Sequence, residues 1–505
     1  MKIINLSKDV TIKQINSEFC IVGSGPGGGV LAVELLKKGV NVALLEQGGD
    51  YRNSDFSQTV DKFNIEGDMD VSFGHSRQVG GSSNLWAGRV SKLEERDLNS
   101  RSSEGWPIEY SELERFYDQA LKILNLSNNN KKKNLNAFGL DSKKLNTKEF
   151  KWSLPPFNVK NYIFNNKSIF KGELTIYTHA KVVSLNEDDL LNQINSLNVI
   201  SPKGEKIKVY SDTFVLAAGG IETPRILLNS KTKNKKGIGN DNDNVGRYFS
   251  THPKVDIGFL RTKKWLSTKN SVFTNRKIGN EFFRHGIGVN ENLCELNHYI
   301  QISSALESEF DYFFESMKKI PYAKFLSKKN IRIVDRLGLM VLNIFGKLSY
   351  LQPFARSFKL RIFLDQIPSR SNRVLLSKAL DKTGVNKVDI HWSFSNKDKK
   401  TLFKFVETIN KEFIRGDFGL IKSDILKEKK LKLTAIHSHF MGTTRMSNVE
   451  KFGVVNQDCR VFNYSNLYIS GPSVFPTYGF ANPFLTIVAL SIRLAEHITN
   501  NKRLM

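Results

Sequence analysis

The sequence predicts an α/β fold in which one sheet is assembled from separate stretches of chain, with a second domain inserted between them. Three observations support this prediction. The chain has 505 residues, more than one ordinary hydrophobic core organises. Its N-terminal part has a strand, a glycine-rich turn, a helix and a second strand in succession. Strand and glycine signals then return after about residue 170 and again after about residue 435, on either side of a long stretch of different texture.

The N-terminal elements form a βαβ unit. Phe19–Val22 is a short apolar run typical of a buried strand, and the glycine-rich sequence GSGPGGG follows it at 23–29. Val30–Lys38 has the composition of a helix and is followed by a glycine, a common helix stop. Asn41–Leu45 predicts the next strand, so that two parallel strands flank one helix.

The turn of this unit has the GxGxxG spacing of a dinucleotide site. Gly23 permits the tight turn, Gly25 lets the backbone approach a pyrophosphate, and Gly28 allows the helix to pack closely on the strand. The helix N-terminus directs free N–H groups and a positive dipole end at the phosphates. Glu46 follows the second strand, about 20 residues after the turn, where a carboxylate accepts hydrogen bonds from the ribose hydroxyls. Because NAD and FAD folds share this fingerprint, the turn alone leaves the choice of dinucleotide open.

Further elements are predicted along the chain. Ser111 and Glu114 have the spacing of a capping box at the start of a helix. Strand-like segments are Leu174–Leu185, Lys206–Tyr210 and Thr213–Ala217. The nucleotide-binding domain is expected to comprise residues 1–100, 170–250 and 435–505, and the second domain residues 101–169 and 251–434.

Composition limits the class of protein. The formal net charge of +25 favours solvated lysine-rich loops, with an anionic substrate or an acidic membrane surface as alternatives. A nucleic-acid partner is disfavoured, because no basic-aromatic module accompanies the charge. The three cysteines, at 20, 294 and 459, are too far apart for a CxxC pair, which argues against a disulfide framework or a metal site.

The sequence also bears on location. Residues 1–18 contain no apolar run long enough for a signal peptide, so a cytoplasmic protein is expected. Leu337–Phe345 is nearly all apolar and flanked by basic residues, but it is far shorter than the roughly 20 residues that span a bilayer. A buried helix is the favoured interpretation, and peripheral docking at a membrane surface is the alternative.

Several further segments, taken together, have a recognisable order. They are VGGSSNLWAGR (79–89), EGWPIEYSELERFY (104–117), LAAGGIETPRILL (216–228), NVGRYFSTHP (244–253), DQIPSRSNRVLLS (365–377), HFMGTTRM (439–446) and the long run at 466–497. This set resembles the glucose–methanol–choline (GMC) oxidoreductases, flavoproteins that oxidise alcohols, and in particular their pyranose-oxidase-like and bacterial sugar-dehydrogenase branch. The resemblance extends from residue 19 to residue 497, and only about 254–360 is unmatched in detail. It implies a Rossmann-like FAD-binding domain and a sheet-and-helix substrate domain.

The resemblance also assigns residues to FAD. Gly80, Gly81 and Ser82 would bring backbone N–H groups against the flavin and its phosphates, since glycine lets the chain pass close. Asn84 would lie beside the isoalloxazine ring. The other positions implied to contact the cofactor are Val182, Ala218, Gly471, Asn482 and Pro483.

Two positions in these motifs affect the expected binding of FAD. Some relatives attach FAD covalently through a histidine in the 79–89 loop, and Leu85 stands at the matching position here. Non-covalent FAD is therefore expected, with His75 as the nearby residue that would change this. Gly471 replaces an aspartate of many family members, so the ribityl hydroxyls must be met by other groups.

By resemblance, His439 and Asn482 are the catalytic pair. A histidine, with an unperturbed pKa near 6.5, suits removal of the alcohol proton, while an asparagine N–H₂ binds the alcohol oxygen. The helix that opens after Asn482 would direct its dipole at the flavin. His437 would share a face with His439 on a strand and is the rival base. His252 is expected to be structural.

The resulting prediction is an FAD-dependent oxidoreductase that moves a hydride from an alcohol carbon, of a sugar or glycoside, to flavin N5. Three alternatives are a flavoprotein of another reaction type, such as a double-bond reductase or monooxygenase, a nicotinamide-dependent dehydrogenase, and a non-catalytic protein that binds FAD. Oxygen, a quinone and a cytochrome all remain candidate electron acceptors.

Overall fold

The structure is a computed structural model of the 505-residue chain. It describes residues 1–8, 11–50, 60–67, 71–99, 105–128, 135, 139–188, 190–267, 276–278, 281–304, 354–428, 431, 433, 435–436 and 438–502. Leu337–Phe345 and His437 lie outside the described residues, as does the side chain of His75. No helix in these ranges is long and apolar enough to cross a bilayer.

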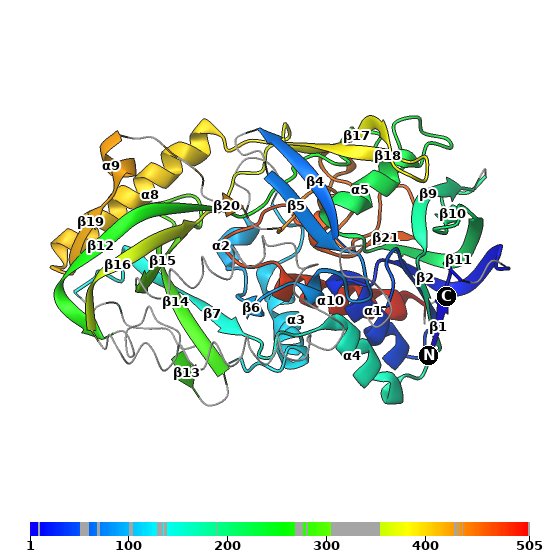
Figure 1. Cartoon of the computed structure of the whole chain (residues 1–505), viewed down its shortest axis with the longest axis horizontal. Coiled ribbons are helices and arrows are strands. Elements are labelled where there is room, and N and C mark those ends of the chain that lie inside the picture. Colours follow the sequence, from blue (N-terminus) through cyan, green and yellow to red (C-terminus); the bar gives the residue numbers. More distant parts are fainter. Residues whose placement is uncertain are drawn as a thin grey trace.

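An eight-stranded sheet carries the N-terminal βαβ unit (Figure 1). Five strands at its centre are mutually parallel, and each pairs in turn with the next: β8, β3, β2, β11 and β21. In spatial order the sheet contains β1 (Lys2–Asn5), β8 (Leu174–Thr178), β3 (Val42–Glu46), β2 (Gln14–Val22), β11 (Lys206–Leu216), β10 (Ile194–Ile200) and β9 (Lys181–Glu187), with β21 (Leu467–Ile469) also paired to β11. The sheet is thus assembled from three separate stretches of chain, as predicted.

Two helices at opposite ends of the sequence cover this sheet side by side (Figure 1). They are α1 (Pro26–Lys37) and α10 (Phe484–Lys502), and α3 (Tyr110–Ile123) packs against α10. Their apolar side chains share one core with the strands. The chain begins α1 directly from the glycine turn, with Pro26 at its first position, where a missing N–H is tolerated.

Three local predictions differ from the structure. Ser111 does not cap a helix: α3 already begins at Tyr110, and no side chain caps its start. The segment Leu174–Leu185 is two strands, because His179 takes a left-handed φ of 57° and turns the chain between them. Conversely, the two segments predicted within 206–217 form the single strand β11.

A nine-stranded sheet forms the other half of the molecule, and its paired strands are antiparallel (Figure 1). In order it contains β19 (Gly419–Lys422), β12 (Pro253–Ser267), β16 (Phe354–Phe363), β15 (Tyr299–Ser304), β14 (Glu281–Val289), β7 (Leu145–Trp152) and β6 (Arg89–Val90), with β13 (Arg276–Ile278) paired to β14 and β20 (Ala435–Ile436) paired to β12. The α/β fold with an inserted sheet-and-helix unit, predicted from the sequence, is confirmed.

The two faces of this sheet differ in chemistry. Side chains alternate between faces along a strand, so Ile300 and Ile302 of β15 point to one face. There they join the apolar core beneath α8 (Asn396–Arg415). Tyr299 and Gln301 point to the opposite face, where Tyr299 meets Phe480 from the C-terminal part of the chain. This second face therefore looks toward the loops that precede α10.

A four-stranded sheet joins both halves along one edge of the molecule (Figure 1). Its order is β17 (Arg373–Leu380), β18 (Asn386–Trp392), β4 (Val60–Gly67) and β5 (Val71–Ser76). The remaining helices are short: α2 (Glu95–Leu98), α4 (Val159–Asn165), α5 (Gly219–Asn229) and α9 (Asp424–Glu428), with 3₁₀ turns at Gly81–Asn84, Lys167–Ile169, Glu450–Phe452 and Pro472–Val474.

Candidate active site

The glycine-rich turn follows β2 and has three different local geometries. Gly23 has a φ of +99°, and a Cβ built on it would lie 2.6 Å from the Ala217 carbonyl oxygen. A Cβ on Gly28 would lie 1.9 Å from the Gly23 oxygen, so this glycine permits close helix–strand packing. Gly25, in contrast, has extended backbone, and its Cβ would meet only Gly81, at 4.0 Å. The turn therefore leaves open space beside Gly25 alone of the three.

The predicted ribose ligand, Glu46, ends β3 beside this turn. Its Oε2 accepts hydrogen bonds from the Ser24 hydroxyl (2.6 Å) and the Ser24 N–H (3.1 Å), and its Oε1 accepts one from Gly48 N–H (2.9 Å). Burial raises the pKa of Glu46, while these hydrogen bonds oppose the shift. A carboxylate has about four acceptor positions. Three donors thus orient the Glu46 side chain and leave capacity for a further donor.

A second glycine loop lies against the first. Gly81 has a φ of +52°, and its Cβ would stand 2.9 Å from Gly25 Cα. Asn84, at the end of the same 3₁₀ turn, donates to the Val79 and Gly81 carbonyl oxygens and accepts from the Asn158 amide. The Asn84 side chain therefore holds its own loop in shape. Of the other predicted loop positions, Gly80 is buried with a φ of +93°, and Ser82 is exposed.

The carboxyl ends of four neighbouring parallel strands meet at this edge: β3, β2, β11 and β21. Glu46 is the last residue of β3, and Gly25, Gly219 and Gly471 come shortly after the ends of β2, β11 and β21 respectively. Gly471 is buried and Gly219, next to Ala218, is half-buried, yet a Cβ on either would meet nothing within 4 Å. A buried glycine with open space beside it marks a cradle that a side chain would fill. Nucleotide cofactors bind outside the carboxyl ends of such strands, so these residues fit FAD.

The remaining cofactor positions predicted by resemblance are Val182, Asn482 and Pro483. Val182 is a buried residue of β9, in the antiparallel part of the sheet. Pro483 accepts a hydrogen bond from Ile487 N–H through its carbonyl oxygen, in the first turn of α10. Asn482 directly precedes that turn and is half-buried. Their roles toward the cofactor remain predictions.

His439 lies beside His252. The two Nδ1 atoms are 2.9 Å apart, and the rings meet edge to face with centroids 5.2 Å apart. The other nitrogen of His252, Nε2, is 3.0 Å from the Gly479 carbonyl oxygen. Residues far apart in sequence are thereby joined in one hydrogen-bonded chain, which ends three residues before Asn482. His252 was expected to be merely structural, and its contact with His439 was missed.

Burial governs the charge of His252, which is 3% exposed. Desolvation lowers its pKa from 6.5 to about 4, with the Asp365 carboxylate opposing the shift and Arg89 adding to it. His252 is therefore neutral at physiological pH.

Arg89 connects Asn482 to the second sheet. Its Nε donates to Asn482 Oδ1 at 3.3 Å, and its Nη1 donates to Gln301 Oε1 at 3.2 Å. The guanidinium lies over the rings of Phe150 and Phe363, at 4.9 and 4.7 Å from their centroids. Such cation–π contacts help to hold the guanidinium in place. Arg89 stands at the end of a motif singled out in the sequence, but its contact with Asn482 was not predicted.

An aromatic wall surrounds this arginine. Phe480 meets the rings of Phe150 and Tyr299 edge to face, each with centroids 5.7 Å apart, and Tyr299 stacks on Phe363 at 4.7 Å. These rings form a small core of their own between the nine-stranded sheet and the loop before α10. Planar apolar surfaces with few polar groups are typical of the walls of small-molecule sites.

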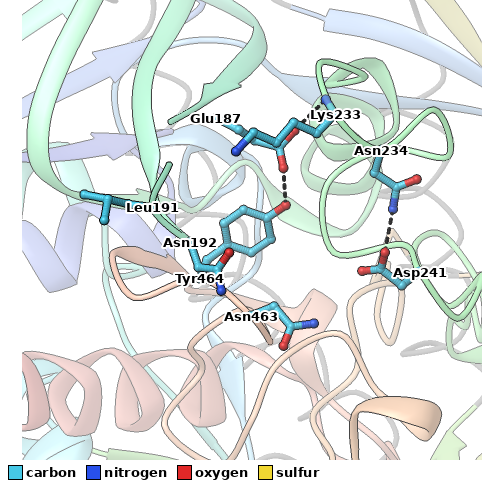
Figure 2. A pocket seen from close by; sticks show the side chains of 8 residues that line it. All are labelled: Glu187, Leu191, Asn192, Lys233, Asn234, Asp241, Asn463 and Tyr464. Atoms are coloured by element: carbon cyan, nitrogen blue, oxygen red, sulfur yellow. Dashed lines mark hydrogen bonds between the residues drawn. The ribbon is translucent and has the colours of Figure 1, made fainter. Parts of the chain in front are cut away.

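A separate hollow of about 510 Å³ lies at the outer edge of the first sheet (Figure 2). Its polar groups largely bond one another: Glu187 accepts from the Tyr464 hydroxyl at 2.6 Å, and Asn234 donates to Asp241 at 2.8 Å. Because these groups satisfy each other, the hollow gives no indication of a ligand.

Comparisons with known proteins agree with this geometry. Residues 368–491 match the family model described as GMC oxidoreductase. The chain is 26% identical over 335 residues to the fructose dehydrogenase large subunit of Gluconobacter japonicus, which covers 63% of this chain and about half (53%) of that subunit. It is 21% identical over 592 residues to 2-methyl-1,2-propanediol dehydrogenase of Mycolicibacterium austroafricanum, covering 97% of this chain and 96% of the relative.

A solved structure shares the whole fold. An FAD-dependent oxidoreductase from Chaetomium thermophilum aligns with a TM-score of 0.61 at 15% identity, covering 97% of this chain and 100% of the other. At this level of identity the likeness shows that the two chains share a fold. Residues 368–491 thus match the C-terminal part of the glucose–methanol–choline (GMC) oxidoreductases, in agreement with the resemblance found in the sequence motifs.

Proposed function

We propose that the protein is an FAD-dependent oxidoreductase that acts on the CH–OH group of a small alcohol, with His439 as the base and Asn482 as the group that binds the alcohol oxygen. The observation that carries this proposal is the hydrogen-bonded chain from His439 through His252 to Gly479, in the loop that leads to Asn482. It links the motif that contains His439 with the start of α10.

His439 would take the proton of the alcohol oxygen. An imidazole is suited to this step, because its unperturbed pKa lies near the pH of the reaction. General-base assistance of this kind is worth about 10²–10⁴-fold in rate. The contact of its Nδ1 with His252 holds the half-buried ring, so that it need not be ordered when substrate binds.

Asn482 would bind the oxygen that loses this proton. Arg89 donates to Oδ1 of Asn482, which directs the Nδ2 donor to the other side of the carboxamide. A donor held in advance stabilises an oxygen that is becoming alkoxide-like without competing for its proton.

The cofactor is proposed to be non-covalently bound FAD, held by the glycine turns at Gly23–Gly28 and Gly80–Gly81, by Glu46, and by the open space beside Gly471. When bound, FAD supplies the hydride acceptor, at N5 of its ring. Leu85, at the position where some relatives carry the linking histidine, has no group that forms such a bond.

The substrate is proposed to be a sugar or glycoside. The name of the fructose dehydrogenase subunit supports a sugar, and that of 2-methyl-1,2-propanediol dehydrogenase supports a smaller diol. Arg89 and Gln301, set among aromatic rings on one face of the second sheet, suit a polyhydroxylated molecule with apolar CH faces. The electron acceptor is oxygen, a quinone or a cytochrome.

Anaerobic reduction of the purified holoprotein tests this function. We expect sugars, glycosides or diols from a panel to bleach the yellow flavin spectrum, and air or a quinone dye to restore it. Precipitation of the protein should release the flavin into solution if it is not covalently bound. A colourless protein that oxidises alcohols only with added nicotinamide would favour the NAD-dependent alternative. A yellow protein that no alcohol reduces would favour another reaction type or a non-catalytic role.

A further inference from the structure

A histidine outside the predicted pair has the geometry to control the state of His439. His252 belongs to the STHP segment that enters β12, and it is buried. Its ring lies at right angles to that of His439, with an interplanar angle of 87°, so that its Nδ1 meets the His439 Nδ1 at 2.9 Å. The fold positions this contact by pairing Pro253 with Ile436 and Ser250 with Met441 on either side.

The partners of His252 fix the direction of both hydrogen bonds. The Gly479 carbonyl oxygen only accepts, so the His252 Nε2 that lies 3.0 Å from it must carry a hydrogen. A neutral imidazole has one N–H, and the neutral form of His252 is favoured by burial. Its Nδ1 therefore has the lone pair and accepts, which makes the His439 Nδ1 the donor.

The charged groups that face His252 act in opposite directions on its charge. The Asp365 carboxylate favours the protonated ring, whereas the Arg89 guanidinium opposes it, and desolvation outweighs both. The neutral state, and with it the acceptor at Nδ1, is a consequence of where the ring is buried.

We propose that His252 is a positioning residue, which holds His439 in the tautomer that has its hydrogen on Nδ1 and its proton-accepting lone pair on Nε2. The inference rests on the proposed function, since it specifies which atom of His439 takes the alcohol proton. When Nε2 accepts that proton, His439 becomes an imidazolium whose Nδ1–H still donates to His252. A hydrogen bond from a charged donor is stronger than one from a neutral donor, so His252 also stabilises the charged state.

Two substitutions separate this role from simple packing. In His252→Gln the side-chain amide offers an acceptor toward His439 and a donor toward Gly479, in the same polarity as the imidazole. In His252→Leu the volume is largely kept, but both hydrogen bonds are lost. We expect His252→Leu to slow flavin reduction by at least about 10²-fold, at the lower end of the worth of a general base, with FAD content and apparent substrate affinity little changed. His252→Gln should remain within about tenfold of wild type.

A second readout does not depend on catalysis. With ¹⁵N-labelled histidine, the ring-nitrogen shifts of His439, assigned by comparison with His439→Asn, distinguish a protonated from an unprotonated nitrogen. We expect Nδ1 protonated and Nε2 unprotonated in the wild type, and a mixture of tautomers in His252→Leu. Nε2 protonated in the wild type would overturn the proposal, as would wild-type rates in His252→Leu or equal losses in both variants. If no alcohol reduces the flavin, the proposed function fails, while the ¹⁵N shifts still decide the tautomer.

Discussion

At the scale of single residues, the orientation of the Asn482 carboxamide determines which of its two polar atoms faces a substrate. Asn482 can offer a substrate either its oxygen, which accepts, or its nitrogen, which donates. Because a guanidinium only donates, the contact with Arg89 Nε must be made by the Asn482 oxygen. Arg89 is itself held by Gln301 and by two aromatic rings. The orientation of Asn482 is thus determined by a residue from a distant part of the chain.

The Arg89→Met substitution tests this arrangement. Methionine retains part of the length and the apolar contacts but not the donor, so the Asn482 amide should lose its fixed orientation. We expect flavin reduction to slow by about 10- to 100-fold, in line with the worth of a hydrogen bond to a charged group. The measurement is anaerobic stopped-flow reduction by an alcohol that reduces the wild type.

A double-mutant cycle provides the control for Arg89. If Arg89 acts through Asn482, Arg89→Met should have little further effect once Asn482 is replaced by alanine. Fully additive losses would show instead that Arg89 contributes independently of the carboxamide.

The sequence predicted some of these residues and not others. His439 and Asn482 were identified from motifs in which each occupies a recognisable position. Their roles remain predictions. His252 and Arg89 were missed as partners, because contacts between residues 187 and 393 positions apart leave no trace in local spacing. The rival base His437 lies outside the described residues.

At the scale of secondary-structure elements, the cofactor cradle follows from parallel strands that end at one edge. The turn after β2 contains two glycines that have different surroundings. Gly28 is closed in by protein backbone, whereas Gly25 faces open space and has a φ of −68°, which any residue adopts. Packing explains the first glycine, and an approaching ligand explains the second.

Alanine substitutions at these two positions should therefore have different effects. Gly25→Ala is expected to leave the thermal unfolding of the FAD-free protein nearly unchanged and to weaken FAD binding by at least about tenfold, or about 1.4 kcal/mol. Gly28→Ala should lower the stability of the FAD-free protein by about 1–3 kcal/mol or more, through overpacking. Fluorescence titration with FAD and thermal melts measure the two effects. Unchanged FAD affinity in Gly25→Ala would argue against a pyrophosphate at this turn.

The strength of the local sequence signals explains which helices and strands could be predicted. The βαβ unit has strong local signals, because the end of β2 and the whole of β3 are buried and its turn needs glycine. It was found in the right place, although β2 and α1 begin earlier, at Gln14 and Pro26, than predicted. The capping box at Ser111 was wrong, because the pattern is short and α3 begins before it. The strand β11 was divided in the prediction at the polar residues Ser211 and Asp212, although the ladder with β2 continues from Ser211 to Thr213.

At the scale of the whole molecule, an ion pair between a buried lysine and a half-buried glutamate helps to join the second sheet to the loops around the site. Lys148 of β7 has a fully buried side chain, and its Nζ donates to both oxygens of Glu94, at 2.7 and 2.6 Å. Asn297 donates to Glu94 and to Asp97, and Lys148 also lies over the Phe480 ring at 5.0 Å. Burial lowers the pKa of Lys148, while Glu94 opposes the shift.

Removal of the carboxylate should therefore destabilise the protein. In Glu94→Gln the Lys148 ammonium keeps its burial but loses its counter-ion, and a loss of about 3 kcal/mol in unfolding free energy is expected. Urea denaturation of the holoprotein measures it. The double variant Glu94→Gln/Lys148→Met, which removes both charges, should recover much of the loss. If the single variant is as stable as wild type, the pair contributes little to the fold.

The overall architecture was predicted because the motifs recur in a fixed order along the chain. The nine-stranded sheet was not predicted strand by strand, since its long antiparallel strands carry no cofactor motif and alternate only in part between apolar and polar residues. The division of the chain into two domains at the stated boundaries remains a prediction. Within residues 101–169, α3 packs on α10 whereas β7 belongs to the second sheet.

The most direct test of His439 as the base is the rate of anaerobic flavin reduction in the His439→Asn variant. Asparagine retains a polar side chain beside His252 but does not accept a proton at neutral pH. If His439 is the base, the variant should be a yellow, folded protein whose flavin is reduced by an alcohol substrate at least about 10²-fold more slowly than in wild type. Reduction at the wild-type rate, with FAD still bound, would contradict this prediction and remove His439 from the mechanism.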